Sequence, residues 1–160
     1  MTGLPLPNDA NLDILSADIA TGKKKLTAVI RLASVGKDST SVYDTYYFNF
    51  SQGGTNYYVD AVYDGSTSSF KAGDFTGPNG QRNDLGDIDG KIDAKKKTIT
   101  MTAPLSMWGF SPTAKLDTFD VLAQRYLGNS NVGGATPTAD EAQSPKTYKG
   151  GTPSCVGPVK

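Results

Sequence analysis

Apolar and polar residues alternate along much of the chain, which is the period of β-strands that bury one face. In residues 26–32, the face that we expect in the core carries Leu26, Ala28, Ile30 and Leu32. The other predicted strands are residues 12–19, 46–50, 57–63, 69–75, 87–93, 98–103 and 118–127. About eight strands joined by short turns predict an all-β fold, an antiparallel β-sandwich of jelly-roll or immunoglobulin-like form.

Two pairs of these strands predict β-hairpins. Residues 12–19 and 26–32 are joined by a short polar turn, in which we expect Gly22 to take a positive φ. Residues 46–50 and 57–63 are joined through a second turn that contains a Gly-Gly pair. Both hairpins favour antiparallel pairing between neighbours in sequence.

The alternating pattern is interrupted in two segments of the second half of the chain. Residues 104–109 predict one short helical turn, since proline opens the segment and glycine ends it. From residue 128 the alternation gives way to Asn, Gly, Ser, Thr and Pro. We therefore expect a β-sandwich domain over residues 1–127 and an extended polar tail or linker over residues 128–160. Cys155 lies in this tail as the chain's one cysteine, so it is expected to be an inert thiol or a cross-link to another chain.

Composition removes most catalytic chemistry. The 160 residues include 16 lysines and arginines, 16 aspartates and glutamates, no histidine and one cysteine, and Glu141 is the only glutamate. A Ser-His-Asp triad, a Cys-His pair and an ordinary zinc site are excluded, so we expect no enzyme activity. The charge is balanced, and no apolar run approaches the roughly 18 residues of a membrane span, so we expect neither nucleic-acid binding nor membrane insertion.

Tyrosines mark the first candidate site. Alternation puts Tyr47 and Asn49 on one face of their strand, and it puts Tyr58 and Asp60 on the face opposite Tyr63. One face of this hairpin must therefore present tyrosine to water or to a partner. Our candidate ligand-binding residues are Tyr47, Tyr58, Asp60 and Tyr63, since tyrosine rings stack on sugars and the aspartate supplies a polar anchor. The alternative is that these aromatic residues only stabilise the sheet.

A cluster of acids marks the second candidate site. Residues 83–90 alternate aspartate with glycine and apolar residues, and Asp84, Asp87 and Asp89 place carboxylates at short spacing. Such oxygens suit a hard cation, so calcium is the expected cofactor if one is bound. The alternative is that the aspartates form the solvated face of a strand and limit edge pairing.

Two lysine triplets occur at predicted turns, in residues 23–25 and 95–97. Short basic runs of this kind usually keep a turn solvated and prevent neighbouring sheets from pairing. Binding of an anionic polymer is the open alternative. Trp108 lies within the predicted helical turn, and we expect it to fill the core instead of forming a binding platform.

Several segments resemble known modules. Residues 8–17 (NDANLDILSA) and 25–30 (KLTAVI) resemble the opening of family 9 carbohydrate-binding modules and of DOMON-type sandwiches. The tyrosine-rich hairpin, ITMTAPLSMWG and PSCV are similar in order to non-catalytic modules of secreted bacterial hydrolases, particularly in actinobacteria. The resemblance implies a secreted, extracellular β-sandwich that clamps a sugar between aromatic rings and holds structural calcium.

These observations lead to two hypotheses. The first is a non-catalytic extracellular accessory or binding module that recognises a polysaccharide or a cell-surface glycan through an aromatic sheet face. The second is a structural or assembly domain of a secreted or surface protein, such as a filament, an adhesin or a spacer, that associates with itself through the tail.

Overall fold

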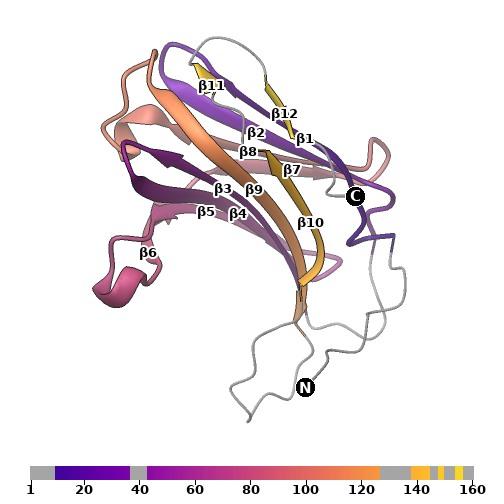
Figure 1. Ribbon diagram of the computed structural model, residues 1–160. Coiled ribbons are helices and arrows are strands. Elements are labelled where there is room, and N and C mark those ends of the chain that lie inside the picture. The colour runs from indigo at the N-terminus through magenta and orange to yellow at the C-terminus, as the bar shows by residue number, and fades with distance from the viewer. Residues whose placement is uncertain (1–9, 37–42, 127–137, 145–147, 150–153, 157–160) are drawn as a thin grey trace.

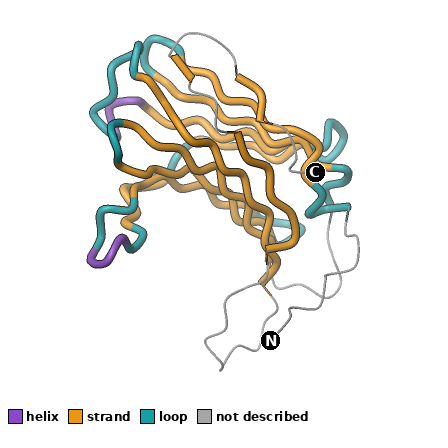
Figure 2. Tube along the Cα trace, viewed as in Figure 1, coloured by secondary structure: helices purple, strands orange, loops and turns teal. Residues whose placement is uncertain are grey.

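The computed structural model describes residues 10–36, 43–126, 138–144, 148–149 and 154–156. In these residues the chain is all-β, and two antiparallel sheets stack as a sandwich (Figure 1). The helical content of the described residues is two short 3-10 turns, drawn in purple in Figure 2. No helix in this part of the chain is long and apolar enough to cross a membrane. The predicted fold class is confirmed.

The first layer is a five-stranded sheet. Its strands, in spatial order, are β12 (Ser154–Val156), β1 (Ile14–Thr21), β2 (Lys25–Leu32), β8 (Thr98–Pro104) and β7 (Asp89–Asp93). Each pair of neighbours is antiparallel. The predicted hairpin between residues 12–19 and 26–32 corresponds to β1 and β2.

The second layer is a seven-stranded sheet. Six strands follow in the order β10 (Thr138–Ser144), β9 (Lys115–Tyr126), β3 (Tyr43–Gln52), β4 (Thr55–Tyr63), β5 (Ser68–Asp74) and β6 (Asn83–Asp87). The seventh, β11 (Tyr148–Lys149), pairs with β9 near Leu116. Strand β9 therefore joins the C-terminal segment to the predicted β3–β4 hairpin.

The core lies between the two sheets, where alternation predicted it. The face of β2 that carries Ile30 is fully buried, and so are Ile99 on β8 and Val59 on β4. The largest of these buried side chains are the aromatic rings of Tyr46, Phe48, Phe50 and Phe119. Burying such rings supplies most of the driving force for stacking the layers.

The two predicted turns have different geometries. Gly53 and Gly54 both have positive φ, of 60° and 85°, in a two-residue turn between β3 and β4. Glycine takes these values without a steric penalty, and the turn suits the twist of an antiparallel hairpin. The prediction of a positive φ at Gly22 is wrong. There, the backbone N–H of Gly22 donates to the carbonyl of Lys25 at 2.8 Å and closes the turn with ordinary φ.

Residues 87–93, which alternation predicted as one strand, belong to two strands in different sheets. Strand β6 ends at Asp87 in the seven-stranded sheet, and β7 begins at Asp89 in the five-stranded sheet. Ile88 crosses between the layers, where its N–H donates to the carbonyl of Phe70 at 3.0 Å. Ile88 and Ile92 both pack against the core. A strand that changes sheet keeps its apolar side toward the same core, so periodicity does not reveal the crossing.

The predicted helical turn is confirmed, and aromatic residues gather after it. A 3-10 turn covers Leu105–Met107, and Gly109 follows with a φ of 70°. Trp108 packs against the core, and its indole N–H donates to the carbonyl of Gly73 at 3.1 Å. Its ring contacts Phe50 edge-on and stacks with Phe110. These aromatic rings close one end of the sandwich.

The C-terminal segment differs in part from the expected tail. Its described parts, β10, β11 and β12, add strands to the sheets, and Cys155 on β12 lies opposite Asp18 of β1. A polar segment can pair in this way because an edge strand needs backbone groups and not an apolar face. The domain boundary at residue 127 stays a prediction.

Candidate functional site

The outer face of the seven-stranded sheet brings the predicted tyrosines together with polar residues. Strand register places Asn49 of β3 between Asp120 of β9 and Tyr58 of β4. In the next row, Tyr47 of β3 lies opposite Asp60 of β4. Alternation along β3 and β4 thus places four side chains on one face, as predicted: Tyr47, Asn49, Tyr58 and Asp60.

Arg82 covers the tyrosines on this face. Its guanidinium carbon lies 4.0 Å from the centroid of the Tyr58 ring and 5.6 Å from that of Tyr47. Tyr58 is fully buried, although it points away from the core, and Tyr47 is half-buried. Burial raises the pKa of both hydroxyls, and the hydrogen bond to Asp84 adds to the effect at Tyr58. Tyr58 therefore has no ring surface free for a sugar while Arg82 is in place.

Asp60 is the buried partner of Arg82. Its Oδ2 lies 2.5 Å from Nη2 of Arg82, and the residue is only 2% exposed. Burial raises the pKa of this carboxyl, and the neighbouring guanidinium opposes the rise. Its other oxygen, Oδ1, is buried and accepts no hydrogen bond from the residues that the structure describes. Removing Arg82 would therefore leave a buried charge without its cation.

Asp84 connects the strands β4, β5 and β6. It accepts hydrogen bonds from the Tyr58 hydroxyl, from Nε of Arg82 at 2.8 Å and from Nζ of Lys71 at 3.3 Å. These donors, the Tyr58 hydroxyl first among them, lower the pKa of Asp84 to about 2. Gly73 of β5 lies between Tyr58 and Asp84, and a Cβ there would clash with the Tyr58 hydroxyl and with the carbonyl of Asn83. Glycine is needed here so that Tyr58 can reach across β5.

The three candidate metal ligands are not brought to one point. Asp84 and Asp87 lie on β6, whereas Asp89 begins β7 in the other sheet. The oxygens of Asp84 already accept the hydrogen bonds described above, and Asp89 pairs with Lys25 at 3.7 Å. Among the described residues, no group of three or more Asp, Glu, His or Cys side chains is placed to hold a metal ion. The geometry gives the calcium hypothesis no support.

Tyr63 lies apart from the other candidate residues. It packs against the core side of β4, opposite the face that carries Tyr58 and Asp60. The structure thus brings together Tyr47, Tyr58 and Asp60 of the predicted ligand-binding set, and it separates Tyr63 from them.

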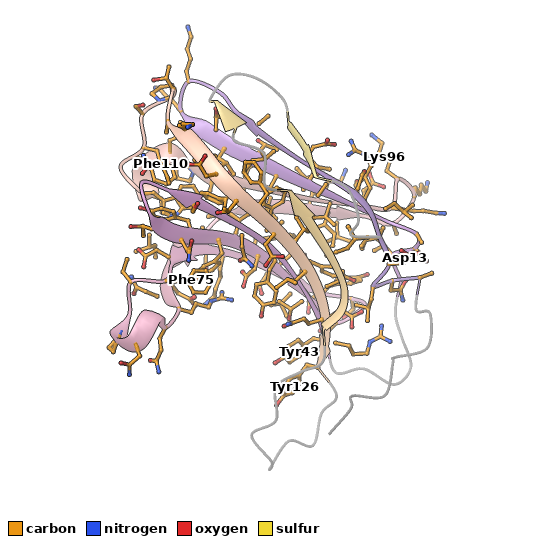
Figure 3. The ribbon with its side chains drawn as sticks, in the orientation of Figure 1. Asp13, Tyr43, Phe75, Lys96, Phe110 and Tyr126 are labelled. Carbon is orange, nitrogen blue, oxygen red and sulfur yellow. The ribbon has the colours of Figure 1, made fainter. Side chains whose placement is uncertain are left out.

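A groove opens beside the tyrosines on the same outer face. It has a volume of about 370 Å³, and its lining residues are Asn49, Phe50, Asn56, Phe75, Gly80, Thr118 and Asp120. The label of Phe75 in Figure 3 marks the side where the loop between β5 and β6 projects from the sheet. The groove therefore has a polar floor from β3, β4 and β9 and an aromatic wall from this loop.

Asn49, which lines this groove, has one buried side-chain atom without a hydrogen-bond partner among the described residues. Its Nδ2 donates to Oδ2 of Asp120 at 3.3 Å, which orients the amide. Its Oδ1 is buried and accepts no hydrogen bond within the described part of the chain. A buried acceptor without a donor costs roughly 1–3 kcal/mol, so the fold holds the Asn49 amide in this orientation at a cost in free energy.

Sequence reasoning missed Arg82, Asp120 and Phe75 as parts of the site. A signal for Arg82 was available, because Asp60 lies within an otherwise apolar stretch of strand and a buried carboxylate needs a cation. Nothing local identifies which cation. Phe75 and Asp120 belong to the site only through strand pairing across the sheet, which no short window of sequence shows.

No family model, no curated protein and no solved structure matches this chain. The resemblance to carbohydrate-binding modules therefore stays an expectation from sequence. The function has to be argued from the groove and the residues around it.

Proposed function

We propose that this chain is a non-catalytic extracellular binding module that takes a carbohydrate in the groove on the outer face of the seven-stranded sheet. The observation that carries the proposal is the lining of that groove. Amide, hydroxyl and carboxylate groups from Asn49, Asn56, Thr118 and Asp120 lie beside the ring of Phe75.

This lining matches the chemistry of a sugar ring. A sugar presents hydroxyl groups, each of which donates and accepts, around a ring with an apolar C–H face. Amide and carboxylate side chains can bind the hydroxyls, and an aromatic ring can cover the C–H face. The volume of about 370 Å³ falls within the roughly 300–1,000 Å³ of small-molecule sites.

The proposal moves the ligand away from the tyrosines that the sequence favoured. The guanidinium of Arg82 already covers the ring of Tyr58, and it forms an ion pair with the Asp60 carboxylate. Tyr47 is half-buried at the border between this ion pair and Asn49. It can contact the edge of a bound sugar, but the hydrogen bonds come from Asn49 and its neighbours.

The test is glycan binding by matched variants. A panel of polysaccharides first identifies one that retains the wild-type protein, and calorimetry then measures the affinity. Asn49→Ala removes the amide, and we expect about a tenfold loss, as for one well-placed buried polar contact. Ser69→Ala, on the same sheet face but outside the groove, should change the affinity less than twofold. If Tyr47→Ala loses affinity and Asn49→Ala does not, the ligand binds on the tyrosines and not in the groove. If no polysaccharide in the panel retains the wild-type protein, the proposal is refuted.

The edges of both sheets favour assembly as a second function. Strands β10 and β12 of the C-terminal segment lie at the outer edges of the two sheets. Edge strands are the elements that copies of a chain can exchange or extend, since pairing needs only backbone groups. Sedimentation of the full chain over a wide range of concentrations separates the hypotheses. A strict monomer at every concentration would rule out self-association.

A further inference from the structure

A second groove lies at the end of the sandwich that the aromatic residues close. It has a volume of about 590 Å³. Lysines 23, 24 and 25 line one side, and Leu105, Ser106 and Phe110 line the other. A backbone hydrogen bond of 2.8 Å from the N–H of Leu105 to the carbonyl of Lys24 holds the two sides together. The lysine turn is thus one wall of a fixed concave surface.

The charge of this groove is not balanced by its own lining. None of the described residues that line the groove is acidic. Lys25 pairs with Asp89 at 3.7 Å, at the exposed surface. Lys23 and Lys24 form no ion pair with any carboxylate in the described part of the chain. Two ammonium groups therefore face the solvent beside an apolar wall, on a protein with no net charge.

We propose that this groove binds an acidic polysaccharide, with its carboxylate or sulfate groups on Lys23 and Lys24 and the apolar face of a sugar ring against Phe110. The shape favours this ligand. Leu105 is buried and Phe110 is half-buried, so the apolar residues line a hollow and do not project as membrane-inserting side chains do. This site is separate from the groove on the outer sheet face, and its proposed ligand does not depend on binding there.

The position in the sheet also disfavours a peptide partner. Peptides commonly add a strand to a sheet edge, where backbone groups are free. Strand β2 is internal, between β1 and β8, and the groove lies where it begins. The carbonyl of Lys24 is already used by Leu105. Recognition here has to come from side chains, which suits a ligand that carries regularly spaced charges.

The second lysine triplet provides a matched control. Lys96 lies at the opposite end of the sandwich from Phe110 (Figure 3). Lys95 and Lys96 are exposed in the turn before β8. The double variants Lys23→Gln/Lys24→Gln and Lys95→Gln/Lys96→Gln change the net charge equally. Only the first pair removes charge from the groove.

The experiment measures binding of the full chain to polygalacturonate by calorimetry at low and moderate salt. We expect Lys23→Gln/Lys24→Gln to weaken binding about tenfold and Lys95→Gln/Lys96→Gln to change it less than twofold. Salt should weaken wild-type binding and reduce the difference between the two variants, because exposed charges are screened. Equal losses in both variants, or no binding by the wild type, would overturn the proposal.

A second variant tests the opposite wall without removing a lysine. Ser106→Glu places a carboxylate in the groove and should weaken binding at least as much, whereas Ser106→Gln should not. Polyglutamate and vesicles of anionic lipid are the competing ligands. Equal or tighter binding of either would overturn the assignment to polysaccharide. Ser69→Ala, outside both grooves, should change binding of polygalacturonate less than twofold. A loss in Asn49→Ala with none in Lys23→Gln/Lys24→Gln would place polygalacturonate in the first groove and overturn this proposal, so failure at one groove is distinguishable from failure at the other.

Discussion

The outer face of the seven-stranded sheet has two halves with different chemistry. In one half, Arg82 covers the ring of Tyr58 and forms ion pairs with Asp60 and Asp84. We call these contacts the latch and this part of the face the latched half. Its polar groups mostly form hydrogen bonds and ion pairs with one another. In the open half, Asn49 and its neighbours line a groove, and the side-chain oxygen Oδ1 of Asn49 accepts no hydrogen bond from the described residues. Both halves come from the same alternation on β3 and β4.

The difference lies in what the loop between β5 and β6 places over each half. Arg82, at the end of this loop, covers the latched half, whereas Phe75, at its start, forms one wall of the open half. An aromatic residue that points outward is therefore not necessarily accessible. Arg82 holds the end of the loop through its ion pairs, and the ring of Phe75 at its start lies edge-on to that of Tyr58, with 5.4 Å between the ring centroids, so both ends of the loop contact the latched half.

The largest effect is expected from Gly73→Ala. The added methyl group would clash with the carbonyl of Asn83 and with the Tyr58 hydroxyl, and a backbone carbonyl cannot yield without moving β6. We expect the free energy of unfolding to fall by about 3 kcal/mol, the upper range of overpacking. Urea denaturation measures it, with Gly22→Ala as control, since a Cβ there meets no atom closer than 3.9 Å. A change of less than 1 kcal/mol in Gly73→Ala would mean that β6 is not held through this approach.

An intermediate effect is expected from Arg82→Ala, which opens the latch. Asp60 then keeps a buried carboxylate without its cation, and we expect a loss of about 2 kcal/mol, less than for a fully buried pair because the Arg82 side chain is 31% exposed. Asp60→Asn in the same chain should recover part of the loss, because the amide carries no charge. No recovery in the double variant would show that Arg82 stabilises the fold through its ring contacts and not through Asp60.

The sequence predicted the framework well, because burial repeats along it. Strand β2 and strand β8 were found from Leu26, Ile30 and Ile99, whose spacing reports the buried face directly. It also predicted that Tyr58 and Tyr63 point to opposite faces. The same alternation failed to separate β6 from β7, since both strands turn their apolar side to one core.

The site was harder to predict because its contacts are not periodic. The chain's arginines, Arg31, Arg82 and Arg125, each pair with an aspartate, but the partners are Asp18, Asp60 and Asp44, at unrelated spacings. Pairing of this kind depends on which strands become neighbours. A single arginine in a polar loop gives no indication of which strand it will cover, so the latch could be recognised only once the sheet order was known.

The smallest effect is expected from Asp84→Asn, and it depends on pH. The pKa of Asp84 is lowered from 3.8 to about 2 in the folded chain, so folding favours the ionised carboxylate. Its contribution to stability is present above about pH 4 and is lost as the pH falls from about 4 to 2. Because the side chain is 42% exposed, we expect about 1 kcal/mol after solvent screening.

Unfolding curves of the wild type and Asp84→Asn at several pH values check this prediction. The difference between the two proteins should be largest at neutral pH, should shrink to less than half near pH 2, where the folded wild-type carboxylate is half protonated, and should disappear below that pH. Asp87→Asn, exposed on the same strand, should differ from the wild type by less than about 0.5 kcal/mol throughout. If the full difference at Asp84 persists at pH 2, the latch acts through the shape of the Asp84 side chain and not through its charge. The latched half would then be stabilised by packing alone.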